Sequence, residues 1–165
     1  MQIDGKGVTI TPDSRLSSIE RAGNKLKATF TPNDPMYNQQ YGPQKVNCPK
    51  AWDSTLGSST VKVAIIDTGV DYTHPDLAGK VIKGRDYVNG DNDPMDDEGH
   101  GTHCAGITAA NTNNGIGVAG AGFNSSIYAI KVLGANGSGS LSDAASAIVE
   151  ATGAGVDIIS MSLGG

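Results

Sequence analysis

The sequence predicts an α/β fold: a parallel sheet with helices on both faces. Three nearly continuous apolar runs, at residues 61–66, 127–133 and 156–163, are typical of strands that are buried on both sides. Segments that can form helices lie between them, at 101–110 and 142–151. This alternation of strand and helix implies right-handed crossovers, which make neighbouring strands parallel.

The first 30 residues have a different pattern from the rest of the chain. We expect a short strand at 8–11, a weak helix at 14–22 and an alternating, half-buried strand at 26–30. The turn-forming run at 31–35, with sequence TPNDP, marks a boundary. The sequence therefore divides into residues 1–30, a pro-segment remnant or N-terminal extension, and residues 31–165, the main domain.

Two features of the main domain concern the start of its second helix and the end of its third strand. Ser142 is a suitable N-cap for the second helix, which would carry Ala145, Ile148 and Val149 on one side. The third strand, with sequence VDIISMSL, is followed only by Gly164 and Gly165, so no crossover covers the edge beside it. We therefore expect a sheet that is truncated after its third strand, and hence the N-terminal portion of a larger domain.

Composition excludes several classes of partner. The chain has 12 Lys and Arg against 17 Asp and Glu, a net charge of −5, and no basic run that could neutralise phosphates, which argues against nucleic acid. No apolar stretch approaches the ~20 residues that span a bilayer, and the N-terminus lacks the layout of a signal peptide. The two cysteines, Cys48 and Cys104, are too few for a disulfide scaffold.

An acid and a histidine are predicted to meet at one edge of the sheet. Asp67 comes directly after the first strand, and His100 begins the first helix. Ligands of open α/β sheets bind beyond the carboxyl ends of the strands. A carboxylate there can accept the Nδ1 proton of an imidazole, which leaves the other ring nitrogen free to act as a general base.

The sequence around these two residues resembles one family. Asp67-Thr68-Gly69, His74-Pro75-Asp76-Leu77, His100-Gly101-Thr102-His103 and Ser162-Leu163-Gly164-Gly165 follow one another as in the subtilisin-like serine proteases, or subtilases. Within that family, residues 31–53 most resemble the thermitase-type enzymes. The resemblance implies a subtilisin-like fold over residues 31–165 and a secreted, extracellular, monomeric serine endopeptidase that acts on polypeptides and binds its own pro-segment.

The resemblance also implies the catalytic roles. Asp67 would orient His100, and His100 would be the general base for a serine in a Gly-Thr-Ser-Met-type motif. That motif does not occur in the 165 residues, and Ser160 and Ser162 do not fit it because they lie in and at the end of the third strand. We therefore expect this chain alone to be nearly inert.

By the same resemblance, a substrate peptide adds as a β-strand between two segments, 133–139 and 162–164. Glycines allow the close backbone approach that this mode of binding needs. Leu133 and Leu141 would form the walls of an apolar pocket. The predicted substrate-binding residues are Leu133, Gly137, Gly139, Leu141, Ser162, Leu163 and Gly164.

The resemblance implies Ca²⁺ as the cofactor, at two sites. The loop 111–118 would bind the ion through the carbonyls of Asn111, Ile116 and Val118, the side chain of Asn114, and the carboxylates of Asp34 and Asp76. A second site would use Asp86 and Asp91, although Asn89 stands where the family has an acid. Independently of the family, the acidic loop 91–98 would repel itself without a cation.

Three alternatives stay open at this point. Asp67-Thr68-Gly69 also resembles the active-site motif of aspartic proteases, whose folds are all-β. His100, His103 and Cys104 could bind zinc, although no fourth ligand is evident. Since no serine motif is present, the chain could also be a non-catalytic calcium-binding module. Cys104 itself, four residues after His100, would share a helix face with that histidine.

Overall fold

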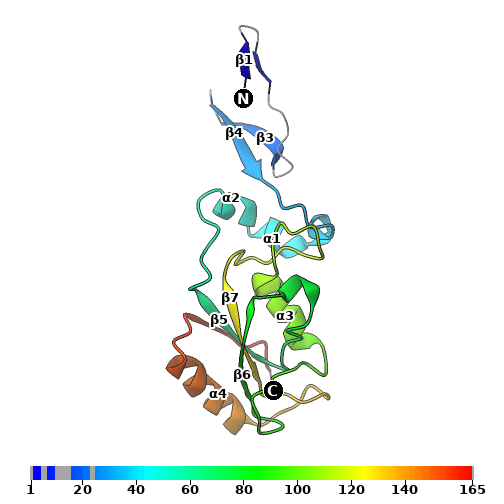
Figure 1. The fold of residues 1–165 in the computed structure, drawn as a ribbon, viewed down its shortest axis with the longest axis vertical. Coiled ribbons are helices and arrows are strands. Elements are labelled where there is room, and N and C mark those ends of the chain that lie inside the picture. Colours follow the sequence, from blue (N-terminus) through cyan, green and yellow to red (C-terminus); the bar gives the residue numbers. More distant parts are fainter. Residues whose placement is uncertain (1, 5–6, 10–15, 23–24, 165) are drawn as a thin grey trace.

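The computed structural model describes residues 2–4, 7–9, 16–22 and 25–164. Its main part is a four-stranded sheet in the order β6-β7-β5-β8, in which every pairing is parallel (Figure 1). The strands are β5 (Lys62–Asp67), β6 (Val81–Asp86), β7 (Ser126–Lys131) and β8 (Ile158–Ser160). The predicted α/β class is therefore confirmed.

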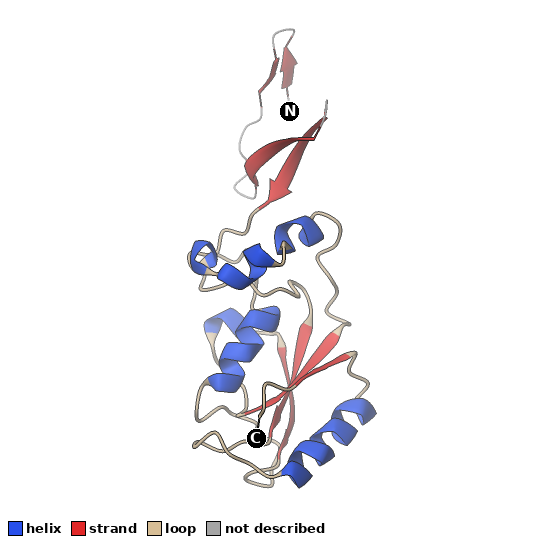
Figure 2. Ribbon diagram, turned by 180° about the vertical axis from the view of Figure 1, so that it is seen from behind, coloured by secondary structure: helices blue, strands red, loops and turns tan. Residues whose placement is uncertain are grey.

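Two long helices cover opposite faces of this sheet, α3 (His100–Ala109) and α4 (Leu141–Gly153) (Figure 2). Alternate residues of β5 divide between the faces: Val63 and Ile65 pack in one core with α3, and Ala64 and Ile66 pack in the other with α4. Small side chains on the helices let them lie close to the sheet. These are Ala105 and Ala109 on α3, and Ala147 and Ala151 on α4.

Some predicted boundaries of these elements were wrong. The N-cap of α4 is Ser140, whose Oγ accepts the backbone N–H of Ser142 at 3.1 Å, so the predicted cap lies two residues too late. Strand β8 occupies only three residues of the predicted 156–163 run. Strand β6 was not predicted, because its sequence VIKGRD is half exposed at the sheet edge and carries no apolar run.

The N-terminal region forms antiparallel hairpins; the strand predicted at 26–30 is confirmed, and the strand predicted at 8–11 overlaps β2, but the predicted helix is not found. The pairs are β1 (Gln2–Asp4) with β2 (Gly7–Thr9), and β3 (Leu16–Ala22) with β4 (Lys25–Phe30). The predicted helix at 14–22 is wrong over its described residues, because cross-strand pairing with β4 outweighs the weak helical spacing of Leu16 and Ile19. Residues 10 and 11 of the predicted first strand lie outside the described residues.

Three short helices connect the hairpins to the sheet: η1 (Tyr37–Gln39), α1 (Tyr41–Lys45) and α2 (Cys48–Trp52). A fourth, η2 (Pro75–Leu77), lies between β5 and β6. The end of β4 meets this region in an aromatic cluster, where Phe30 lies 6.1 Å from Trp52 and 5.6 Å from Phe123 between ring centroids. None of the described helices is both long and apolar enough to cross a membrane.

Candidate active site

The structure brings Asp67 and His100 into direct contact. Asp67 is the last residue of β5 and His100 is the first residue of α3, and His100 Nδ1 lies 2.7 Å from Asp67 Oδ1. The side chain of Asp67 is 1% exposed, whereas that of His100 is 45% exposed. The hydrogen bond to Asp67 and the negative charge of its carboxylate raise the pKa of His100. With the Nδ1 proton donated to Asp67, the other ring nitrogen can accept a proton.

Close contact between the start of α3 and the end of β5 makes this pairing possible. A Cβ atom on Gly101 would lie 2.1 Å from the carbonyl oxygen of Gly69, so no other residue fits there without a backbone shift. The N–H of Gly101 donates to Thr68 Oγ1 at 2.9 Å. Gly101 and Thr68 therefore hold the histidine and the aspartate at their hydrogen-bonding distance.

The sequence analysis missed Asp96 as a site residue, although it bonds both to Thr68, directly after β5, and to the first turn of α3. Its carboxylate accepts hydrogen bonds from Thr68 Oγ1 at 2.8 Å and from the N–H groups of Gly99 and Thr102, both at 2.9 Å. Burial opposes the charge of Asp96, but the hydrogen bonds from Thr102, Gly99 and Glu98 outweigh it and lower the pKa to about 2. An aspartate just before a predicted helix start was the available signal.

We expect Asp96→Asn to lower the free energy of unfolding by about 1–2 kcal/mol near pH 7. The lowered pKa of Asp96 corresponds to about 1.36 kcal/mol per pKa unit, and solvent screening at this partly exposed site reduces the total. Because the folded-state pKa lies below the ordinary value of 3.8, this stabilisation is present above about pH 4 and is lost as the pH falls towards 2. Urea titrations followed by the fluorescence of Trp52 would measure the difference at each pH. Asp143→Asn, in the first turn of α4, is the matched control. A difference between Asp96→Asn and wild type that is equally large at pH 2 and pH 7 would contradict this account.

The sequence analysis also missed Lys131, a buried lysine that links the residue after Asp67, the acidic loop and the chain that follows β7. Lys131, at the end of β7, is fully buried, and its Nζ donates to the carbonyls of Thr68 at 2.6 Å and Leu133 at 2.7 Å and to Asp97 Oδ1 at 2.6 Å. All three ammonium hydrogens therefore have acceptors. A single lysine within the apolar run IYAIKVL was the signal in the sequence.

The residues predicted to bind substrate line one groove of about 820 Å³, together with His100. Leu133 and Gly139 form an antiparallel bridge on one side of it. A Cβ on Gly139 would lie 2.0 Å from the carbonyl oxygen of Val132, so this position requires glycine. The predicted residues along the groove are Leu133, Gly137, Gly139, Leu141, Ser162, Leu163 and Gly164.

Oxygen atoms gather at the loop 111–118 as a calcium site would need. Asp34 and Asp76 are both buried and both contact this loop: Asp34 Oδ2 accepts the N–H of Asn113 at 2.7 Å, and Asp76 Oδ1 accepts Asn114 Nδ2 at 2.8 Å. Burial, and to a smaller degree the charge of Asp76, raise the pKa of Asp34. Two buried carboxylates at one loop fit the preference of Ca²⁺ for hard oxygen ligands, and the amide of Asn114 lies beside one of them. Asn111, Ile116 and Val118 lie in the same loop, and Asn111 Nδ2 donates to the carbonyl of Ala78 at 3.0 Å.

Asp86 and Asp91, the predicted second calcium site, meet through their backbones. The N–H of Asp86 donates to the carbonyl of Asp91 at 2.9 Å. The buried carboxylate of Asp86 accepts the N–H groups of Val88 at 2.7 Å and Asn89 at 2.9 Å, so it closes its own turn. The second site stays a prediction.

Two aspartates of the acidic loop before His100 form ion pairs with lysines of the protein. Asp93 pairs with Lys83 at 3.0 Å, and Asp97 pairs with Lys131 at 2.6 Å. These contacts neutralise part of the charge of the loop, and that a cation also binds there stays a prediction.

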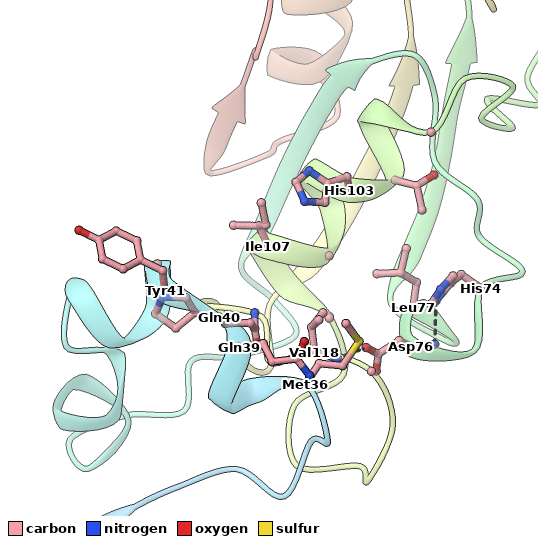
Figure 3. Close-up of a pocket in the computed structure, with 17 residues that line it drawn as sticks. Met36, Gln39, Gln40, Tyr41, His74, Asp76, Leu77, His103, Ile107 and Val118 are labelled. Carbon is pink, nitrogen blue, oxygen red and sulfur yellow. Dashed lines mark hydrogen bonds between the residues drawn. The ribbon is translucent and has the colours of Figure 1, made fainter.

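The zinc alternative does not match the geometry. Among the described residues, the group of three metal-binding side chains that lie together is Asp67, His100 and Cys104, not the predicted trio with His103. Cys104 Sγ lies 3.9 and 4.0 Å from the two nitrogens of His100, and burial raises the pKa of the thiol. His103 lines a separate pocket of about 630 Å³ with Ile107 and Tyr41 (Figure 3). The aspartic protease alternative is wrong, because it requires an all-β fold.

Comparison with known proteins identifies the family. A model of the subtilase family matches residues 58–165. The chain is 57% identical over 140 residues to the thermophilic serine proteinase of Bacillus sp. (strain AK1), a match that covers 84% of this chain and 35% of that protein. It is 53% identical over 137 residues to thermitase of Thermoactinomyces vulgaris, covering 82% and 49%. It is 50% identical over 144 residues to halolysin of Haloferax mediterranei, covering 84% and 28%. The chain thus spans less than half the length of these relatives, and it belongs to the subtilase family.

Proposed function

We propose that this chain supplies the acid and the base of a serine endopeptidase, and that the nucleophilic serine lies outside these 165 residues. The observation that carries the proposal is the 2.7 Å contact between the buried Asp67 and the half-exposed His100 in a chain of the subtilase family. An imidazole that is oriented by a buried carboxylate and open to a groove is built to transfer protons.

In this mechanism His100 moves one proton twice. Its free nitrogen takes the proton of the serine hydroxyl as the oxygen attacks the peptide carbonyl, and then gives that proton to the leaving amine. The carboxylate of Asp67 holds the ring in place and stabilises the imidazolium between the two steps. Water then hydrolyses the acyl-enzyme with the same base.

The groove beside His100 supports polypeptides as the substrates. Leu133 to Gly139 and Ser162 to Gly164 lie along it, so an extended peptide would hydrogen-bond to backbone on both sides. Leu133 and Leu141 would contact an apolar side chain of that peptide. The loop at 111–118 with Asp34 and Asp76 would bind a stabilising Ca²⁺, and the whole enzyme would be secreted and monomeric. Residues 1–30 would be the remnant of a pro-segment or an extension.

A serine-directed probe tests this function. The 165-residue chain should neither hydrolyse peptide amides above background nor react with a fluorophosphonate, because it carries neither the serine motif nor an oxyanion donor for it. A longer protein that contains this segment should react at one serine, and Asp67→Asn should slow that reaction. If the longer protein is not labelled, or if the short chain turns over peptides on its own, the proposed function fails.

A further inference from the structure

The groove beside His100 contains one formally charged side chain among the described residues that line it, namely Glu98. Apart from His100, the rest of the lining consists of serines, glycines, leucines and other uncharged residues. A single charge in an otherwise neutral groove decides which charged substrate side chains are attracted and which are repelled.

Glu98 is held at the rim of the groove by a hydrogen bond to the backbone. Its Oε2 accepts the backbone N–H of His100 at 2.8 Å, which holds the carboxylate next to the histidine. Two neighbouring acids differ from it, since Asp93 pairs with Lys83 at 3.0 Å and Asp97 pairs with Lys131 at 2.6 Å. Within the described part of the chain, no lysine or arginine forms an ion pair with Glu98.

We propose that Glu98 makes the subsite beside His100 select a lysine or arginine side chain of the bound peptide. The inference rests on the proposed function, because it assumes that an extended peptide lies in this groove. A cationic side chain next to the histidine would meet the free oxygen of Glu98, whereas an acidic one would be repelled. Because Glu98 is exposed, the attraction is modest and decreases with salt.

The test is a lysine scan. Capped, otherwise uncharged hexapeptides carry Lys, norleucine or Glu at each position in turn, and they are titrated into the ¹⁵N-labelled full chain at low ionic strength. The amide shifts of His100 and Gly139 report occupancy of the groove. At one peptide position we expect Lys to bind about threefold more tightly than norleucine and Glu about threefold more weakly, as for an exposed ion pair. Both differences should disappear in 1 M NaCl.

Two variants distinguish the effect of the Glu98 charge from that of the overall negative charge of the protein. Glu98→Gln keeps an oxygen for the N–H of His100 and should abolish both differences. Asp93→Asn removes the same charge from the same loop but outside the groove, and it should keep them. Equal binding of the Lys and norleucine peptides at every position, or a preference that survives in Glu98→Gln, would overturn the role of Glu98 while leaving the groove as a peptide site. If no peptide shifts the amides along the groove, the proposed mode of substrate binding fails as well.

Discussion

Replacing His100 by alanine should lower kcat by about six orders of magnitude in a protease that contains this segment and its serine. In subtilisin, removal of the base alone costs ~10⁶ in kcat, a value taken from that enzyme rather than from this structure. At about 1.36 kcal/mol per tenfold change, this is roughly 8 kcal/mol of transition-state stabilisation. The loss is so large because a serine hydroxyl is a poor nucleophile until a base removes its proton.

Variants of Asp67 and His103 test whether the loss of activity is specific to the base. Asp67→Asn should cost less, about 10⁴ in kcat, since the base remains but loses its orientation. His103→Ala is the matched control, because His103 lies on the same helix and lines a different pocket. It should keep kcat within a few-fold of wild type. Initial rates on a peptide amide, normalised by active-site titration, give kcat and KM separately. Activity of His100→Ala within tenfold of wild type would rule out the assignment of the base.

The second large effect is expected from calcium. Ligand at about 100 times its dissociation constant stabilises a folded protein by about 2.7 kcal/mol if the unfolded chain does not bind it. For a domain of this size each kcal/mol corresponds to about 2–4 °C. Chelation should therefore lower the melting temperature of the chain by roughly 5–10 °C relative to saturating Ca²⁺, as measured by circular dichroism.

Variants of the two predicted sites separate their contributions. Asp76→Asn should remove most of the sensitivity to chelation, because the buried carboxylate next to Asn114 is lost. Asp91→Asn should keep most of it, because Asp91 lies outside the loop 111–118, and any part that it removes measures the contribution of the second predicted site. The same melting temperature with and without chelator in the wild-type protein would reject the calcium site at the loop 111–118.

The sequence predicts best the strands that are buried on both faces. β5 and β7 were predicted from apolar runs because both faces of each are covered, so almost every position must be apolar. β6 was missed because an edge strand needs few apolar residues. The helix predicted at 14–22 proved to be strand β3, since a short segment with two apolar residues takes its structure from the strand beside it.

By itself the sequence determined the α/β class, the family resemblance and the order of aspartate and histidine, because these depend on local patterns and short motifs. Only the tertiary structure decided which groups meet across the chain. Asp96 joins the acidic loop to α3, Lys131 joins it to Leu133 at the groove, and Asp34 contacts a loop 79 residues away. A polar side chain in a sequence has many possible partners. Once the side chain is buried, it must pair with a group that the packed fold brings within about 3 Å, because an unpaired polar group in the interior costs too much free energy.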